Sequence, residues 1–359
     1  MDNHRRWKVN IGFLCLFLCL VILTGCGGEI ADTRVVLTTG LKKDEVFRIE
    51  YISCTKPEMM VYITNMQNQY ENVYGEEIWK TEGYGTTLKE RVMDNALAKM
   101  AQVKTMNLMA KSRGITLSSQ EAASVESAAD IYYSSLSQTE IESMGINRNT
   151  ISGLYGEYLT ARKVYQDIIK DVNPEISDDE ARNITIDYIL IKTYKMTSDG
   201  TRVEYEENER LKAYAKAQEA YKEAVDGESF DMLIAKYNEA DESSASVSKE
   251  DIESDYVRTS LFDLAKDEIS PILSIKDGYL IAKCDSTYDL EETDQNKIAI
   301  VDERREMAFS EEYDKYVENL TRKLNDALWE EIDFLHDDEI ATSSFFKVAD
   351  ESLILDEQL

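Results

Sequence analysis

The spacing at which hydrophobic residues recur along this chain changes twice, and no other feature limits its fold so strongly. From about residue 55 to 172, apolar residues recur at the three-to-four-residue spacing of amphipathic helices. Val172-Asn173-Pro174-Glu175 breaks that pattern, and Ile184 to Ile191 is a β-rich apolar run. The helical period returns over Lys297 to Trp329. The simplest fold is therefore α+β, with a strand-containing domain inserted into an all-helical lobe.

Local start and stop signals subdivide the first helical region. Thr55-Lys56-Pro57-Glu58 combines an N-cap residue, a first-turn proline and the glutamate of a capping box. Thr86 to Arg113 predicts a longer helix that ends at Gly114, and Ser118-Ser119-Gln120-Glu121 predicts the start of the next one. Ahead of these helices, Val46 to Ile52 alternates apolar and polar residues, which predicts a half-buried strand.

The inserted region mixes strands and short helices. Its predicted elements, in chain order, are a strand at Ile184 to Ile191, helices at Leu211 to Val225, Phe230 to Tyr237 and Ser260 to Leu264, and strands at Pro271 to Ser274 and Tyr279 to Lys283. Lys276-Asp277-Gly278 predicts a hairpin turn between the last two strands, and a Ser-rich loop precedes the third helix. This order is typical of an α+β domain.

The last helix is expected to pack back on the N-terminal helices. Glu331 to Leu335 is expected to pair with the strand at Val46 to Ile52, and the acidic tail after His336 is expected to be loosely held. The resulting segments are a signal peptide at 1–25, a tether at 26–45, a helical lobe at 46–182, an inserted domain at 183–290, a returning helix at 291–335 and a tail at 336–359.

Composition excludes several classes of function. With 40 basic and 70 acidic residues the formal net charge is -30, and such a surface repels nucleic acid and anionic lipid headgroups. The only histidines are His4 and His336, so a structural zinc site or a Ser-His-Asp triad lacks its parts. We expect no metal and no cofactor. Cys54 and Cys284 either form a disulfide or remain two separate buried thiols.

The N-terminus resembles that of a bacterial lipoprotein. Basic residues lie between Arg5 and Lys8, and the apolar run from Ile11 to Leu23 is too short to span a bilayer comfortably. Leu23-Thr24-Gly25-Cys26 follows the pattern of a lipobox. The resemblance implies that Cys26 is acylated and becomes the first mature residue, anchored at the outer face of the bacterial cell membrane. An uncleaved anchor and an ordinary signal peptide are the alternatives.

Residues 184–286 resemble a parvulin-type peptidyl-prolyl isomerase domain. The matching pieces are Ile186 to Ile191, Ala217 to Ala220, Gly227 to Phe230, Ala235 to Tyr237, Ser243 to Ser246, Ser260 to Phe262, Asp267 to Pro271 and Asp277 to Ile281. Together with the lipobox and the flanking helices, the chain resembles the PrsA-like foldase lipoproteins, whose layout is related to that of the SurA chaperones. This resemblance implies unfolded or newly exported polypeptides as partners, and it leaves a homodimer open.

The resemblance also locates the catalytic positions. Parvulins resemble one another in using two strand histidines, an acidic or cysteine group between them, and an apolar pocket for proline. The matching catalytic positions hold Tyr188, Leu280 and either Asp241 or Glu242, and the proline-pocket positions hold Glu253, Val257 and Phe262, the last of which is chiefly a core position. Because both histidines are replaced, the resemblance implies a foldase or chaperone whose isomerase domain is catalytically degenerate.

Two other functions remain as alternatives. An active isomerase would use Tyr188 with Asp241 or Glu242. A solute-binding lipoprotein fits the lipobox, although the helical first half lacks the alternating strand–helix units of a two-lobed binder.

The helical region holds more than half of the chain's 12 methionines, among them Met59, Met60, Met66, Met93, Met100, Met106 and Met109. They predict either core packing or an adaptable client-binding surface, and their exposure distinguishes the two.

Overall fold

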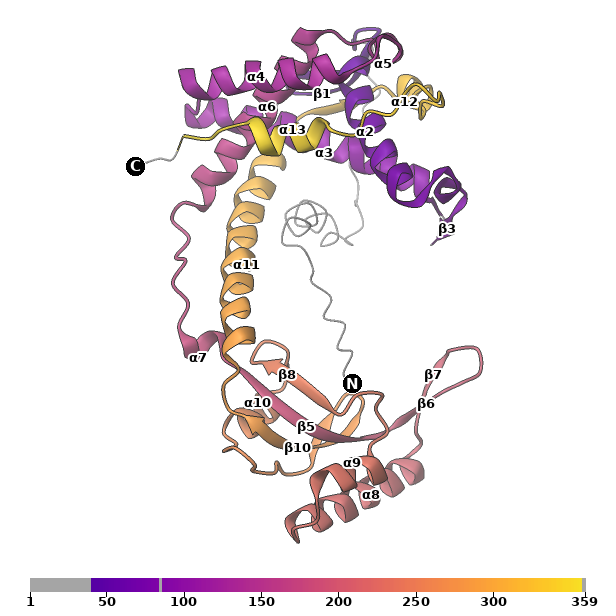
Figure 1. The fold of residues 1–359 in the computed structure, drawn as a ribbon, viewed down its shortest axis with the longest axis vertical. Coiled ribbons are helices and arrows are strands. Elements are labelled where there is room, and N and C mark those ends of the chain that lie inside the picture. Colours follow the sequence, from indigo (N-terminus) through magenta and orange to yellow (C-terminus); the bar gives the residue numbers. More distant parts are fainter. Residues whose placement is uncertain (1–39, 84–85, 357–359) are drawn as a thin grey trace, which may run out of the picture. The chain divides into compact units, whose positions relative to one another are not determined.

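The structure, a computed structural model, describes residues 40–83 and 86–356 (Figure 1). Cys26 and the rest of the lipobox lie outside these residues. The chain divides into two compact units, the first formed by residues up to Asp171 together with Glu306–Leu359, and the second by Val172–Arg305. The sequence predicts boundaries at 183 and 290 for the inserted domain, so the second unit extends beyond them at both ends. Within the described ranges, no helix is long and apolar enough to cross a bilayer.

Helices form most of the first unit. They are α2 (Lys56–Tyr74), α3 (Leu88–Arg113), α4 (Ser119–Ser135), α5 (Gln138–Met144), α6 (Arg148–Ile169), the end of α11 (Leu290–Val317), α12 (Asp326–Glu330), α13 (Phe345–Ser352) and the 3-10 helix η2 (Glu76–Lys80). The predicted capping boxes at Thr55 and Ser118 are confirmed, as is Gly114, which ends α3 in the left-handed region at φ 70. Phe309 on α11 lies in one apolar cluster with Val103 of α3.

A small antiparallel sheet completes the first unit, in the order β11 (Arg322–Leu324), β1 (Glu45–Ile49), β2 (Ile52–Thr55). The single predicted strand at 46–52 is wrong, because the chain reverses at Glu50, which has φ 52, and forms a hairpin. The expected pairing of Glu331 to Leu335 is also wrong. Leu324 lies opposite Phe47 because α11 ends at Val317 instead of continuing to residue 329. A two-residue pair, β3 (Glu82–Gly83) and β4 (Thr86–Thr87), precedes α3.

The acidic tail does not behave as the sequence predicted. Phe345 and Phe346, on α13, have only 0% and 4% of their surface exposed and belong to the main core of the first unit. The prediction of a loosely held tail is wrong. The free energy gained by burying the two adjacent aromatic side chains exceeds the repulsion among the acidic residues around them.

The methionines of the helical region fill the core. Seven are buried, namely Met59, Met60, Met93, Met100, Met106, Met109 and Met144, and Met66 is half-buried. The interpretation of this set as an adaptable client surface is therefore wrong, and core packing is the observed role.

The second unit is built on an antiparallel sheet in the order β8-β5-β10-β9. Its elements are α7 (Asp178–Ala181), β5 (Asn183–Lys192), β6 (Tyr194–Met196), β7 (Arg202–Glu204), α8 (Glu207–Val225), α9 (Phe230–Tyr237), β8 (Ser244–Ser248), α10 (Asp255–Phe262), β9 (Leu273–Ile275), β10 (Gly278–Ser286) and the start of α11. The α+β class is thus confirmed. The Ser-rich loop proves to be β8, and α10 begins at Asp255 instead of Ser260 because Ser254 caps it.

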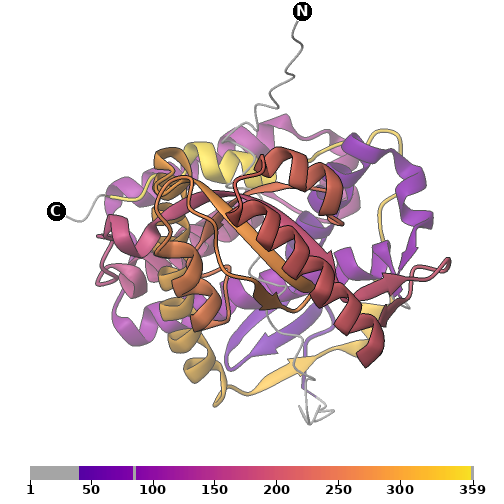
Figure 2. The ribbon, with the colours of Figure 1, turned by 90° about the horizontal axis from the view of Figure 1, so that it is seen from below.

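Alternate residues of the central strands enter two separate cores. Ile189 and Ile281 pack under α8 and α9, and Figure 2 shows α8 lying across the strands. Ile186 and Leu280 face the opposite side, which α10 covers. The antiparallel pairing of the strands differs from the alternating strand–helix units of a two-lobed solute binder.

Glu45 is a buried carboxylate at the start of β1, and it accepts hydrogen bonds from the Arg48 and Ser53 side chains and from the Lys42 N–H. Burial alone would raise its pKa, but these donors outweigh burial and lower the pKa from 4.5 to about 2. The unfolded chain therefore binds a proton at higher pH than the folded one. The carboxylate's stabilising contribution is present above about pH 4.5 and is lost as the pH falls through 2.

We expect Glu45→Gln to lower the free energy of unfolding by about 2 kcal/mol at pH 7. Urea unfolding curves of variant and parent should converge as the pH approaches 2. Glu77→Gln is the control, since the Glu77–Lys80 pair is on the surface and contributes at most about 1 kcal/mol. A constant difference between Glu45→Gln and the parent at all pH values would contradict this assignment.

Candidate functional site

One face of the second unit's sheet brings together four of the predicted site residues. In the antiparallel pair of β5 and β10, Tyr188 lies opposite Ala282 and Leu280 opposite Leu190. Residues two apart on a strand share a face, so Tyr188 and Leu280 are diagonal neighbours on one face. Val257 and Phe262 reach this face from α10.

This face is almost entirely apolar. Leu280, Val257 and Phe262 have 8%, 4% and 7% of their surface exposed and pack in one cluster, at the edge of which Tyr188 is half-buried. The Leu280 side chain has no hydrogen-bonding atom, so it can neither donate to a substrate amide nor accept from it. Val257 and Phe262 contribute to a packed core.

Of the two acidic candidates, Glu242 is the one whose charge acts on Tyr188. Burial raises the pKa of the Tyr188 hydroxyl, and the negative charge of Glu242 raises it further. Asp241 and Glu242 are both exposed. The neutral Tyr188 phenol and the neighbouring Glu242 side chain are therefore the polar part of this site.

The loop that carries Glu242 is fixed to β5 by Asn238, a residue that the sequence interpretation missed. The Leu190 N–H donates to Asn238 Oδ1 at 2.9 Å, and Asn238 Nδ2 donates to the Glu242 carbonyl at 2.9 Å. The Tyr188 N–H donates to the Ser243 carbonyl at 2.7 Å. Asn238 follows α9 directly, and a side chain that can bond to main-chain groups at such a helix end was the available signal.

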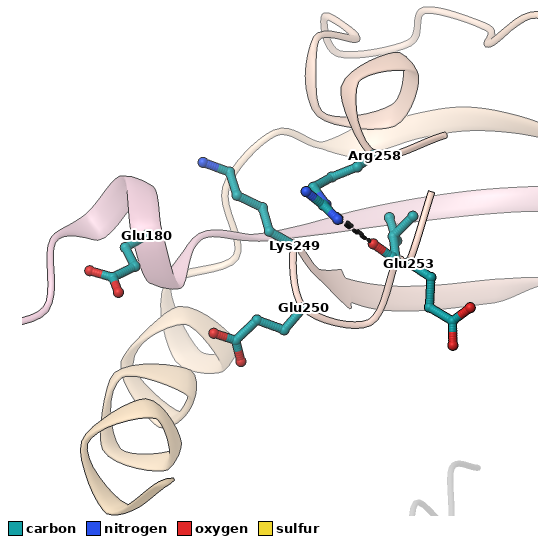
Figure 3. Close-up of a pocket in the computed structure, with 6 residues that line it drawn as sticks. Glu180, Lys249, Glu250, Glu253 and Arg258 are labelled. Atoms are coloured by element: carbon teal, nitrogen blue, oxygen red, sulfur yellow. Dashed lines mark hydrogen bonds between the residues drawn. The ribbon is translucent and has the colours of Figure 1, made fainter. Parts of the chain in front are cut away.

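Glu253, the third predicted proline-pocket residue, lies apart from Val257 and Phe262. It is exposed and lines an open pocket of about 500 Å³, together with Glu180, Lys249, Glu250, Ile252 and Arg258 (Figure 3). Arg258 Nη2 donates to the Ile252 carbonyl at 2.8 Å. Burial raises the pKa of Glu250, and neighbouring carboxylates add to the effect. The pocket is charged, whereas a proline ring requires apolar walls.

A second open pocket, of about 650 Å³, combines aromatic and aliphatic side chains with charged ones. It is lined by Tyr205, Glu206, Glu207, Arg210, Leu211, Tyr214 and Tyr279. The Tyr214 and Tyr279 rings are 5.1 Å apart, and 60% of Leu211 is exposed. Exposed apolar groups around a concave surface are typical of protein-binding sites. The sequence interpretation missed this pocket because Leu211 and Tyr279 are distant along the chain.

The remaining chemistry of the described residues is limited. They contain no group of three or more His, Cys, Asp or Glu residues placed to hold a metal ion. Cys54 and Cys284 are free buried thiols, and burial raises the pKa of both. Of the two readings of the cysteines, separate thiols are the observed one.

Comparisons with known proteins give structural similarities only. No family model and no curated protein matches the sequence. The structure is similar to the PrsA peptidylprolyl isomerase of Bacillus cereus, with 15% identity, 74% of this chain and 92% of that chain covered, and a TM-score of 0.36. It is similar to the foldase protein PrsA of Streptococcus pneumoniae, with 15% identity, coverage of 76% and 98%, and a TM-score of 0.26.

A SurA-like chaperone of Campylobacter jejuni is similar at 13% identity, with coverage of 78% and 98% and a TM-score of 0.27. The expected resemblance to PrsA foldases and SurA-like chaperones is therefore found among solved structures. No activity follows from similarities of this size.

Proposed function

We propose that this chain is an extracytoplasmic chaperone for unfolded polypeptides, in which the isomerase-like sheet serves binding and no longer catalyses. The observation that supports this best is the packing of the sheet face. Leu280 and Val257 occupy positions at which the resemblance expects a histidine and a pocket group, and both are buried in one apolar cluster. An enzyme that isomerises prolyl bonds must lower a barrier of about 18–20 kcal/mol, and this requires groups that favour the twisted amide.

Exposed apolar surface on the second unit supports the binding role. Leu211, Tyr214 and Tyr279 line an open pocket, and 58% of Met196, on the nearby strand β6, is exposed. Unfolded chains expose apolar side chains, which such a surface can cover. The similar structures include a foldase and a SurA-like chaperone, which agrees with this proposal.

Membrane attachment forms part of the proposal. Acylated Cys26 would hold the chain at the outer face of the cell membrane, where exported polypeptides emerge unfolded. The net charge of -30 gives no attraction to anionic headgroups, so the lipid would have to supply the attachment.

One experiment separates the chaperone from an active isomerase. With the soluble chain from Gly27 onward, we expect aggregation of an unfolded test protein to slow at equimolar concentration. Exchange NMR on a proline peptide should show the uncatalysed isomerisation time of about 10–100 s. Both measurements use the same sample, so aggregation suppression shows that the protein in the exchange measurement is functional.

The second candidate function, an active isomerase, is favoured by the Glu242 charge next to Tyr188. It requires faster exchange that Tyr188→Phe abolishes and that Tyr256→Phe, at an exposed tyrosine, leaves unchanged. Such a result would overturn the catalytic part of the proposal. Absence of aggregation suppression would overturn the chaperone itself.

A further inference from the structure

The segment from Leu335 to Asp356 lies on the helices of the first unit in the manner of a bound peptide. Residues 336–344 contain no helix or strand, and α13 follows them. Few main-chain hydrogen bonds join residues 336–344 to one another. One of them runs from the Ile340 N–H to the Asp337 carbonyl at 2.9 Å. The remaining polar main-chain groups therefore need partners from outside the segment.

Amide side chains on α2 supply many of these partners. Gln67 binds Leu335 twice, accepting from its N–H at 3.1 Å and donating to its carbonyl at 2.9 Å. The other amides make these contacts: Asn68 Nδ2 to the carbonyls of Ile340 at 3.3 Å and Thr342 at 2.8 Å, Gln69 Nε2 to the Ser343 carbonyl at 3.1 Å, and the Phe345 N–H to Asn65 Oδ1 at 2.9 Å. One helix thus follows the main chain of the segment from Leu335 to Phe345.

Side chains of α4, α5 and α6 continue the contact. They bond to main-chain groups as follows: Glu140 Oε1 accepts from Ala341 at 3.0 Å and Thr342 at 2.7 Å, the Tyr155 hydroxyl donates to the Phe345 carbonyl at 3.0 Å, Ser124 Oγ accepts from Ile354 at 3.2 Å, and Glu121 Oε1 accepts from Asp356 at 3.2 Å. Contacts to main-chain atoms hold a polypeptide with little regard to its sequence, as in extended peptide recognition.

Two aromatic anchors give the contact its side-chain preference. The Phe345 ring lies among Tyr62, Tyr132 and Tyr155, with centroid distances of 5.5, 5.3 and 4.5 Å, and it is stacked on the last. The Phe346 ring meets Tyr62 edge-on at 5.1 Å, and Lys99 Nζ lies 3.9 Å from its centroid. Aromatic groups in such boxes dominate the energy of peptide recognition.

Three amide side chains of α2 are buried beneath the segment. Asn65, Gln67 and Asn68 have 0%, 1% and 3% of their surface exposed. A helix satisfies its own interior main-chain groups, so buried amide side chains on it require other partners or remain costly to bury. The segment's N–H and carbonyl groups are partners of all three amides, although Asn65 Nδ2 also donates to the Val61 carbonyl and the Tyr132 hydroxyl, and Gln67 Nε2 to Glu71.

We propose that this face of α2, α4, α5 and α6 is a polypeptide-binding groove, and that Leu335–Asp356 is its intramolecular ligand. A client segment with adjacent aromatic residues competes for the same groove, so the chain's own C-terminal segment keeps the groove closed when client is absent. The competition rests on the proposed chaperone function, whereas the groove itself rests on the contacts of Leu335–Asp356.

The first test uses the full soluble chain and a fluorescent synthetic peptide of residues 334–356. Phe345→Ala in the chain removes the main anchor of the intramolecular competitor, so the peptide should bind this variant at least about tenfold more tightly than the parent chain. A peptide that itself carries Phe345→Ala should bind the variant at least about tenfold more weakly. Lys347→Ala in the chain is the matched control, because Lys347 lies on the same helix with its side chain 71% exposed, and it should leave the peptide affinity at the parent value.

A second test needs no substitution and covers the case in which Phe345→Ala fails to fold. Hydrogen exchange on the parent chain should show Val348 and neighbouring amides of α13 exchanging at least about tenfold faster than the interior of α2. Excess unlabelled peptide should increase their exchange further. Equal exchange of α13 and α2, unchanged by peptide, would overturn the groove, since the segment would then open only with the whole unit.

The outcomes distinguish the groove from the proposed function. Aggregation suppression without peptide binding would overturn the groove and leave the chaperone standing. Peptide binding without aggregation suppression would leave the groove and overturn the chaperone.

Discussion

Replacing Lys104 with methionine should destabilise the first unit by about 3–5 kcal/mol. Only 2% of the Lys104 side chain is exposed, and its Nζ lies 2.8 Å from Glu58 Oε1 and 2.7 Å from Glu157 Oε2. Burial opposes the charge of Lys104, but the two carboxylates outweigh it and raise its pKa. Without the ammonium group, two like charges from α2 and α6 remain together beside α3.

The pH dependence of this loss identifies its cause. Burial already raises the pKa of Glu157, and Lys104 limits that rise. In Lys104→Met the folded chain should take up a proton on Glu157 at higher pH than the unfolded chain. The folded state then binds more protons, so the variant's stability rises as the pH falls, and the deficit should be smaller at pH 5 than at pH 8.

Tryptophan fluorescence measures this unit selectively. In the soluble chain from Gly27 the tryptophans are Trp79 and Trp329, and both lie in the first unit. Lys80→Met is the control, because its partner Glu77 is exposed and the pair contributes at most about 1 kcal/mol. Equal stability of Lys104→Met and Lys80→Met would contradict a structural role for the buried ion pairs.

Gly278→Ala should disrupt the second unit, at a cost of about 3 kcal/mol or more. Gly278 begins β10 with φ +149, and a Cβ at this position would lie 2.0 Å from the main-chain oxygen of Ile191. Relief requires β5 and β10 to separate, because both atoms belong to paired main chain. The energetic cost of the strained backbone and that of the steric overlap therefore add.

The second unit contains no tryptophan, so this variant has an internal check. Far-ultraviolet circular dichroism should show an earlier unfolding transition while the fluorescence transition stays at its parent midpoint. Gly200→Ala separates strain from overlap, since Gly200 has φ +83 with no atom within 4 Å of a Cβ, and it should cost about 1–2 kcal/mol. Similar losses for both glycines would contradict the predicted overlap.

The parts of the fold that local signals specify could be predicted from the sequence. Capping boxes at Thr55 and Ser118 fixed two helix starts, and α9 has the predicted bounds Phe230–Tyr237. The strand β8 was missed because serines have low strand propensity, and its register is set by pairing with β5. Tertiary pairing of this kind leaves no local pattern.

The candidate site was predictable only where strand alternation determines it. Side chains alternate between the two faces of a strand, so the sequence predicts which residues of β5 share a face and which of β10 do. The pairing of Leu280 with Leu190 then places Tyr188 and Leu280 on the same face of the sheet. Glu253 precedes α10 in an irregular stretch, so its separation from Val257 depends on loop geometry. The role of Asn65 and Gln67 was not visible, since buried and exposed amides look alike in a sequence.

The discontinuity of the first unit has a consequence for the order in which the chain acquires structure. The second unit is continuous, from Val172 to Arg305, whereas the first needs β11 and Phe345 from the far end of the chain. During synthesis from the N-terminus, α2 to α6 emerge first but must wait for the last residues before their sheet and aromatic core are complete. We expect the second unit to fold early and the first to finish only after release, with the slow rate typical of contacts distant in sequence.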